Sequence, residues 1–149
     1  MPTEVLYFDT SYLVRLYLED PGFKQVRTIA ESATAIGSAW HAQAEIISAV
    51  HRTFRERELD QVAFVALLDQ FASDSKGGLF QWLPLTESIQ QRLEIAYRRA
   101  PDSVFLRAAD ALHLACAAEH DFNEVHSNDR RFLAAAPLFG LNGVNVIPD

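Results

Sequence analysis

The stretch Val5-Leu6-Tyr7-Phe8, followed at once by Asp9-Thr10-Ser11, decides the fold prediction for this chain. Four consecutive apolar residues that end at a carboxylate and two hydroxyls are typical of a buried strand that leads directly into a helix capped by a hydroxyl. The beginning of the chain therefore predicts a strand–helix unit of the kind from which α/β sheets are built.

The rest of the chain continues this alternation of short apolar runs and longer amphipathic segments. We expect strands at residues 5–8, 34–37, 79–83, 124–127 and 144–147. We expect helices at residues 12–18, 23–32, 40–57, 62–72, 87–99, 107–120 and 129–136. Short strands alternating with helices predict an α/β fold with a mainly parallel sheet. Since no repeat, low-complexity stretch or linker divides the sequence, we expect a single domain over residues 1–149.

Length and composition agree with one globular domain. The 149 residues are 49% hydrophobic and 22% charged, which is ordinary globular usage and argues against disorder, collagen-like repeats and coiled coils. No apolar run approaches the roughly 20 residues of a membrane span, and Glu4 and Asp9 interrupt the region where a secretory signal would stand. The single cysteine, Cys116, excludes an internal disulfide and a thiolate zinc site. We therefore expect a cytoplasmic protein.

The chain carries a net charge of −7, with 13 basic and 20 acidic residues. Taken alone, this charge argues against nucleic-acid binding, because nucleic-acid-binding proteins normally present a basic surface. Whether the argument holds depends on where the acidic residues lie.

Four acidic residues stand where a metal site would need them. In open parallel sheets, ligands bind beyond the carboxyl ends of the strands, and Asp9 and Asp129 follow two of the predicted strands. Asp110 lies early in an otherwise apolar helix, so we expect it to be buried and therefore protonated, paired or bound to a metal. Glu45 lies in another helix, about 150° from the centre of its apolar arc.

Each of these acids also has a purely structural explanation. Asp9 and Asp129 can cap the helices that they precede. Asp110 can complement a helix N-terminus or pair with Arg107 one turn earlier, and Glu45 can be an ordinary solvated helix position. If the four converge instead, two carboxylates about 5 Å apart repel by roughly 3 kcal/mol, so the group needs a divalent cation or raised pKa values. Oxygen ligands suit Mg²⁺ or Mn²⁺, which support phosphoryl chemistry.

Several segments together resemble the PIN-domain nucleases, and among these the VapC-like toxins of bacterial and archaeal toxin–antitoxin pairs. The segments are Asp9-Thr10-Ser11, Glu45 within a helix, Leu106-Arg-Ala-Ala-Asp-Ala-Leu-His-Leu-Ala115 and Ser127-Asn-Asp-Arg-Arg-Phe132. The resemblance covers nearly the whole chain, in the family's order and with similar spacing. The last two segments together are the more specific signal.

The resemblance implies a three-layer α/β/α fold and a catalytic quartet around Mg²⁺ or Mn²⁺, formed by Asp9, Glu45, Asp110 and Asp129. Ser11 matches the family hydroxyl that hydrogen-bonds near the first aspartate, and Ser127 matches the hydroxyl residue two positions before the last acid. The resemblance further implies cleavage of single-stranded or structured RNA, often tRNA, by a homodimer that a small cognate antitoxin occludes. No acid of the quartet is missing, so nothing suggests an inactive enzyme.

Two arginines are candidates for contacts with the RNA backbone. Arg52 is seven residues after Glu45, on the same helix face within about 20° and about 10 Å along the axis. Arg130 directly follows Asp129. For most of the arginines, a solvated or paired surface position is the stronger explanation. A local cationic rim on an acidic molecule predicts modest, salt-sensitive RNA affinity.

Other interpretations remain open at this stage. His113, one turn beyond Asp110, can donate to a carboxylate or to RNA, although a packed histidine is the simpler explanation. Aspartyl-phosphate chemistry also places an aspartate after the first strand, but the dehalogenase-like pattern needs a second aspartate where Ser11 stands. A non-catalytic interaction module would use the acids only as helix caps, and a stand-alone RNA-processing nuclease would share the catalytic residues without being a toxin.

Overall fold

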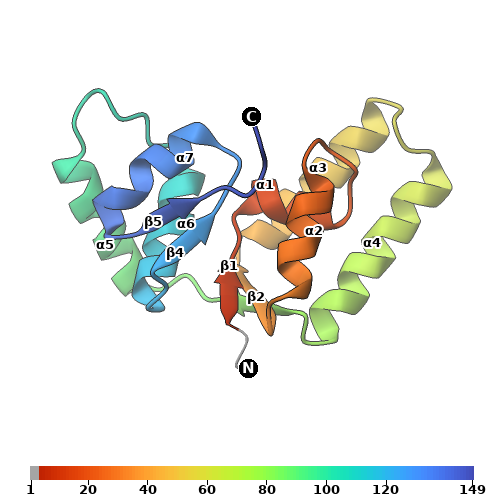
Figure 1. Cartoon of the computed structure of the whole chain (residues 1–149), viewed down its shortest axis with the longest axis horizontal. Coiled ribbons are helices and arrows are strands. Elements are labelled where there is room, and N and C mark those ends of the chain that lie inside the picture. Colours follow the sequence, from red (N-terminus) through yellow and green to blue (C-terminus); the bar gives the residue numbers. More distant parts are fainter. Residues whose placement is uncertain (1–3) are drawn as a thin grey trace.

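The computed structural model of the protein describes residues 4–149, and its strands and helices alternate as the sequence predicts (Figure 1). The strands are β1 (Val5–Tyr7), β2 (Ala35–Ala39), β3 (Phe80–Leu83), β4 (Glu124–His126) and β5 (Asn142–Val144). The helices are α1 (Thr10–Leu13), α2 (Phe23–Glu31), α3 (Ala42–Arg55), α4 (Gln61–Lys76), α5 (Glu87–Arg99), α6 (Ala108–Glu119) and α7 (Arg130–Ala135), with 3₁₀ turns η1 (Val14–Leu16) and η2 (Ala136–Phe139).

Every strand pairing in the described part of the chain is parallel, as predicted. β1 pairs with β2, β2 pairs with β3, and β4 pairs with β5. A parallel bridge between Phe8 and His126 joins the two groups of strands, and the Asp9 N–H donates to the His126 carbonyl at 3.0 Å. The spatial order is therefore β3-β2-β1-β4-β5. This order places the carboxyl ends of β1 and β4 side by side, and with them the residues that follow each strand.

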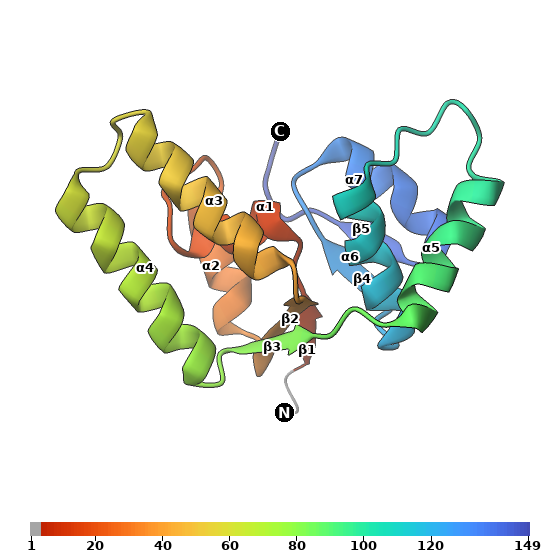
Figure 2. The ribbon, with the colours of Figure 1, turned by 180° about the vertical axis from the view of Figure 1, so that it is seen from behind.

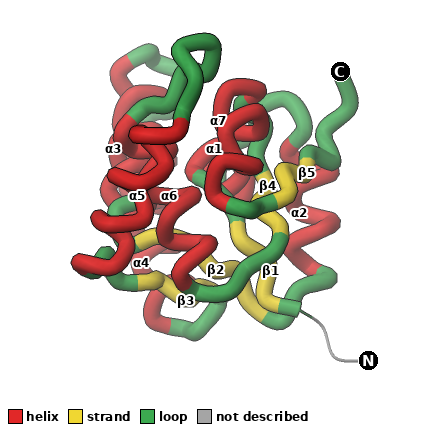
Figure 3. The backbone as a smooth tube through the Cα atoms, turned by 90° about the vertical axis from the view of Figure 1, so that its left-hand side faces the viewer, coloured by secondary structure: helices red, strands yellow, loops and turns green. Residues whose placement is uncertain are grey.

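Helices cover both faces of the sheet (Figure 1 and Figure 2). Phe8 packs into a core with residues of α1 to α4, whereas the preceding residue, Tyr7, packs into a core with residues of α6 and α7. Helix α5 joins the second side through a small cluster that includes Ile89 and Cys116. Figure 3 views the molecule from the side on which α5 and α6 lie. The arrangement is the predicted three-layer α/β/α fold.

The predicted end of the first helix is wrong. It does not continue regularly to Leu18, because α1 stops at Leu13 and the chain tightens into η1. The N–H of Tyr17 bonds the Val14 carbonyl three residues back, which is the tighter pattern of a 3₁₀ turn. The Arg15 guanidinium then donates to the carbonyl of Pro21 at 2.8 Å and ties this turn to the next segment.

The predicted last strand is also misplaced, since β5 ends at Val144 instead of beginning there. Beyond that residue the Val146 N–H donates to the Tyr12 hydroxyl at 2.7 Å, so it makes no ladder bond to a neighbouring strand. The same hydroxyl donates to the Asn145 side chain. A side chain more than 130 positions away in sequence thus ends the strand.

The remaining helix and strand boundaries differ by a few residues from those predicted from the sequence. Helix α3 starts at Ala42 rather than at residue 40, and the Trp40 N–H extends the β2–β3 ladder by donating to the Leu83 carbonyl. Helix α4 continues past Ala72 to Lys76. Within residues 4–149, no helix is both long and apolar enough to cross a lipid bilayer.

Candidate active site

Asp9 lies at the carboxyl end of β1 and is buried, with only 4% of its surface exposed. Its Oδ1 caps α1 by accepting the Tyr12 N–H at 3.2 Å. The hydroxyls of Ser11 and Ser127 donate to its two oxygens. Both hydroxyls accept backbone N–H groups from the segment after β4 at 2.9 Å, so their own hydrogens are directed at the Asp9 carboxylate. Asp9 is therefore held in one orientation.

The protonation of Asp9 reflects this burial. Burial raises its pKa to about 6, although the hydrogen bonds from Ser11 and Ser127 act in the opposite direction. A carboxylate whose ionisation is this costly gains stability from any positive charge placed beside it. The site is consequently suited to receiving a cation.

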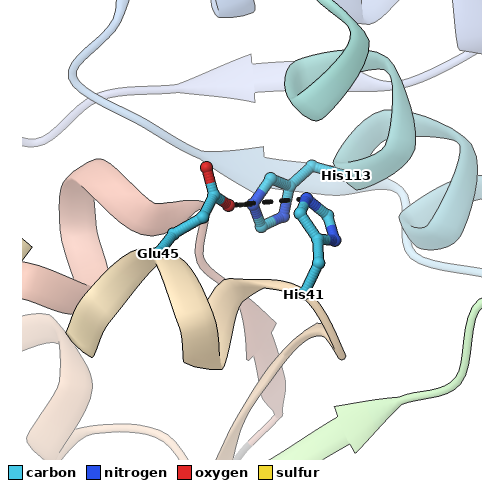
Figure 4. Close-up of side chains that lie close together, drawn as sticks. All are labelled: His41, Glu45 and His113. Carbon is cyan, nitrogen blue, oxygen red and sulfur yellow. Dashed lines mark hydrogen bonds and ion pairs between the residues drawn. The ribbon is translucent and has the colours of Figure 1, made fainter. Parts of the chain in front are cut away.

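Glu45 lies in the first turn of α3, and within residues 4–149 its side-chain hydrogen bonds and ion pairs are made by one oxygen, Oε1 (Figure 4). The Thr10 hydroxyl donates to it at 2.8 Å, and the Nε2 atoms of His113 and His41 lie 3.0 and 3.4 Å away. Burial raises the pKa of Glu45, but the bonds from His113 and Thr10 outweigh it and hold the pKa below its ordinary value. Glu45 is thus a carboxylate anchored at one oxygen, while the other points away from both imidazoles.

Asp110 and Asp129 are connected by one arginine. The Nε of Arg107 donates to Asp110 Oδ2 at 3.2 Å, and its Nη2 donates to Asp129 Oδ2 at 2.7 Å. Asp129 uses its other oxygen to cap α7 through the N–H groups at the start of that helix. The structural explanations are therefore present as well: Asp110 pairs with Arg107, and Asp129 is an N-cap.

Asp110 is only partly buried, whereas the sequence predicts a buried residue. Its side chain remains 16% exposed, because α6 begins at Ala108 and Asp110 lies in the first turn, before the helix enters the core. Partial burial raises the pKa of Asp110, with a further contribution from the charge of Asp129, while Arg107 opposes both. Asp110 therefore stands between the core and the surface.

A groove of about 740 Å³ opens at the carboxyl ends of β1 and β4. Its walls come from α1, η1, α3 and the segment after β4, and they include Glu45 and Asp129. Arg52 also lines the groove, on the same helix as Glu45, and Arg15 joins it from η1. Arg130 is not among the lining residues, since its exposed side chain lies 3.6 Å from Asp149.

Three of the four predicted acids, Asp9, Asp110 and Asp129, are linked through shared partners, whereas Glu45 is held separately by Thr10 and two histidines. Asp110 and Asp129 share Arg107, and the Ser127 hydroxyl donates to Asp9 while accepting the Asp129 N–H. In residues 4–149, no three of these acids have oxygens that all lie within 4.8 Å of one another.

The residues present nevertheless fit a divalent cation. Arg107 bridges two carboxylates although 53% of its side chain is exposed, which shows that positive charge is favoured between them. The quartet offers only oxygen donors, and this donor set suits Mg²⁺ or Mn²⁺ rather than a thiophilic metal.

Sequence reasoning did not assign Thr10, His41 or Arg107 to the site. The signal for His41 was available, because it stands four residues before Glu45 and therefore on the same helix face. Thr10 directly follows the first aspartate. The contact of Arg107 with Asp129 joins two different elements, so no local spacing indicates it.

Residues 6–137 match the sequence model of the PIN domain. The chain belongs to the PIN-domain family. The match confirms the family and the fold class that the sequence predicts, and it argues against the dehalogenase-like alternative.

Solved structures share the PIN fold with this chain. FitAcB from Neisseria gonorrhoeae aligns over 95% of this chain and 97% of its own, with a TM-score of 0.75 and 18% identity. VapC20 from Mycobacterium tuberculosis, described as a sarcin–ricin loop cleaving toxin, aligns over 87% and 94%, with a TM-score of 0.67 and 17% identity. VapBC2 from Rickettsia felis, bound to a promoter DNA fragment, aligns over 95% and 98%, with a TM-score of 0.64 and 14% identity. No curated protein matches the chain.

Proposed function

We propose that this PIN domain is a metal-dependent endoribonuclease and the toxin of a toxin–antitoxin pair. The observation that carries the proposal is the groove at the carboxyl ends of β1 and β4, lined by the carboxylates Glu45 and Asp129 together with the arginines Arg15 and Arg52. Acids that attract a cation, placed beside guanidinium groups, suit a polyanionic chain whose phosphates must be held and cleaved.

In the proposed site, Asp9, Glu45, Asp110 and Asp129 are the residues that would hold a Mg²⁺ or Mn²⁺ ion. When bound, such an ion lowers the pKa of a water and stabilises negative charge on phosphate oxygens. The protein's own contribution is orientation: the serine hydroxyls fix Asp9, and the Thr10 hydroxyl and His113 fix one oxygen of Glu45. Fixed carboxylates need no reorganisation during the reaction, which is how a preorganised site accelerates it.

We assign RNA binding to Arg52, which lines the groove from α3, and to Arg15, which lines it from η1. Arg52 follows Glu45 along α3, so a strand whose scissile phosphate lies at the acids can place a neighbouring phosphate on Arg52. Because the chain as a whole is acidic, this contact is local and its contribution to affinity decreases as salt increases. Arg130 remains a weaker candidate, since it lies outside the groove lining.

The proposed biological role rests on the similar proteins. VapC20 is described as a toxin that cleaves the sarcin–ricin loop, and a similar structure from Klebsiella pneumoniae is a toxin–antitoxin complex with a TM-score of 0.57 and 20% identity. We extend this role to the present chain: RNA, including tRNA, as substrate, a small cognate antitoxin as inhibitor, a homodimer as the active form and the cytoplasm as its location. Light scattering of the purified protein measures its oligomeric state.

A stand-alone RNA-processing nuclease is the alternative that shares these residues. The two roles differ in the cell, because a toxin arrests growth when it is expressed without its antitoxin. Growth arrest by the parent chain and normal growth with Asp9→Ala support the toxin. Normal growth with an active, expressed parent enzyme supports the alternative.

The catalytic assignment is tested with Glu45→Gln and Asp129→Asn, which remove a charge with little change in shape. Asparagine can still cap α7, so the fold should persist. Both variants should lose at least about 100-fold in RNA cleavage in Mg²⁺. Glu56→Gln, an exposed acid at the end of the same α3 helix, is the matched control and should cleave as the parent does. Parent-like cleavage by Glu45→Gln or Asp129→Asn would disprove the assignment.

A further inference from the structure

A second group of possible metal ligands lies beside the acidic quartet and has a different chemistry. His41, Glu45 and His113 come together from α3 and α6 (Figure 4). Their ligand atoms all lie within 4.8 Å of one another, and within residues 4–149 they form the one such group of histidine, cysteine and acidic side chains. The two imidazole rings are close neighbours, with centroids 4.4 Å apart.

The distances in this group match a tetrahedral metal site. An ion with ligands about 2.0–2.1 Å away in tetrahedral geometry separates those ligands by about 3.3 Å. Glu45 Oε1 lies 3.0 Å from His113 Nε2 and 3.4 Å from His41 Nε2. Thr10 Oγ1 lies 2.8 Å from the same Glu45 oxygen and 3.2 Å from His113 Nε2, so it marks the direction of a fourth ligand. Little movement is needed to admit an ion.

His113 also has the supporting contact that metal-bound histidines have. Its second ring nitrogen, Nδ1, lies 2.8 Å from the hydroxyl of Tyr7, which is fully buried on the sheet. When the Tyr7 oxygen accepts the Nδ1 hydrogen, His113 Nε2 is left with a lone pair directed at the group. Such a partner fixes both the tautomer and the ring orientation of a metal-binding histidine.

His41 is incompletely satisfied in the protein alone. Its Nδ1 atom is buried without a hydrogen-bond partner among the described residues, and its Nε2 atom is within 3.2 Å of the Ala109 carbonyl and 3.4 Å of Glu45. Zinc would bind His41 through Nε2, the atom that faces Glu45, in place of the Ala109 carbonyl, and the ring hydrogen would then lie on Nδ1.

We propose that His41, Glu45 and His113 form a binding site for Zn²⁺, distinct from the oxygen-only quartet and sharing Glu45 with it. Imidazole nitrogen is a good ligand for Zn²⁺ and a poor one for Mg²⁺. Zn²⁺ would therefore bind Glu45 together with the two histidines, whereas Mg²⁺ would bind Glu45 together with the other acids. Zinc bound in this way withdraws Glu45 from the quartet and inhibits Mg²⁺-supported cleavage. The inhibition rests on the proposed function, whereas the binding of zinc does not.

Zinc binding is measured on the full chain after removal of metals with a chelator. Calorimetric titration with ZnCl₂ should show a site that depends on both histidines, and CoCl₂ should give the visible absorption of tetrahedral Co²⁺. His41→Ala should weaken zinc binding at least about tenfold, because even supporting contacts of a metal site contribute that much. His51→Ala is the matched control, since His51 is an exposed histidine on the same helix and should leave the affinity unchanged.

His113 is buried, so His113→Gln serves as a second variant, with circular dichroism to verify its fold. It should also bind zinc at least about tenfold more weakly than the parent. Two results would overturn the site: no zinc binding by the parent, or equal affinity in His41→Ala, His113→Gln and the His51→Ala control.

The activity measurement separates this proposal from the proposed function. In Mg²⁺, zinc should inhibit RNA cleavage by the parent and by His51→Ala, and His41→Ala should need at least about ten times more zinc for equal inhibition. Zinc binding that depends on His41 in a protein that cleaves no RNA supports the zinc site and refutes the nuclease. RNA cleavage by a protein whose zinc binding does not depend on His41 supports the nuclease and refutes the zinc site.

Discussion

Replacement of Asp9 by asparagine measures the energetic cost of placing a carboxylate at the buried end of β1. In the metal-free protein, burial raises the pKa of Asp9 from 3.8 to about 6. Between these values the folded protein holds a proton that the unfolded chain has released. The contribution of protonated Asp9 to the free energy of unfolding is therefore fully present below about pH 4, and it is lost as the pH rises through about 6. The difference of about 2 pKa units corresponds to about 3 kcal/mol.

Asp9→Asn cannot titrate, so the variant should lack this part of the pH dependence. The amide also replaces one oxygen that accepts the Ser127 hydroxyl, at a cost of about 1–3 kcal/mol. Because that cost is nearly the same at every pH, it shifts the curve without changing its slope. The change of slope therefore isolates the buried charge.

The assay is urea unfolding in EDTA at several pH values between 4 and 7.5. From pH 4 to pH 7, the free energy of unfolding of Asp9→Asn relative to the parent should rise by about 2.4 kcal/mol. Asp60→Asn, which alters the exposed N-cap of α4, should follow the parent's curve. A difference between Asp9→Asn and the parent that is the same at pH 4 and pH 7 would refute the argument.

Three further predictions concern the same site. Mg²⁺ at one hundred times its dissociation constant should stabilise the parent against unfolding by about 2.7 kcal/mol, measured in a thermal melt. If Mg²⁺ stabilised Asp129→Asn equally, Asp129 would be excluded as a ligand. Ser127→Ala should lower the unfolding free energy at pH 7 by about 2 kcal/mol, since it removes a donor to Asp9, whereas the exposed Ser88→Ala should change it by less than about 0.5 kcal/mol. Arg52→Ala should weaken RNA binding and lower the slope of log affinity against log salt by about 1. Arg98→Ala, on the exposed face of α5, is the control and should keep the slope of the parent. Identical slopes for Arg52→Ala and the parent would exclude Arg52 from the RNA interface.

The order of strands and helices was predictable from the sequence, because the patterns involved are local. The run Val5-Leu6-Tyr7-Phe8 is apolar on both faces, and the structure packs Tyr7 and Phe8 against opposite helical layers. Helix α5 lies at the predicted residues, since Thr86 caps its start and Pro101 follows its end. Errors arose where distant side chains intervene, as when the Tyr12 hydroxyl ends β5.

The candidate site was predictable in its acids but not in their partners. Asp9 and Asp129 follow strands, so topology alone brings them to the same edge of the sheet. The contacts of Glu45 with Thr10 and His113 span 35 and 68 residues, and no local pattern encodes such a distance. The partial exposure of Asp110 depends on where α6 enters the core, which the apolar composition of the helix does not specify.

The most direct test of the nuclease assignment is incubation of the purified chain, freed of any bound antitoxin, with total RNA in Mg²⁺, in Mn²⁺ and in EDTA. Asp9→Ala is treated in parallel. We expect discrete RNA fragments from the parent in either metal and none from the parent in EDTA or from Asp9→Ala. Cleavage that persists in EDTA, or equal cleavage by Asp9→Ala in Mg²⁺, would contradict the assignment.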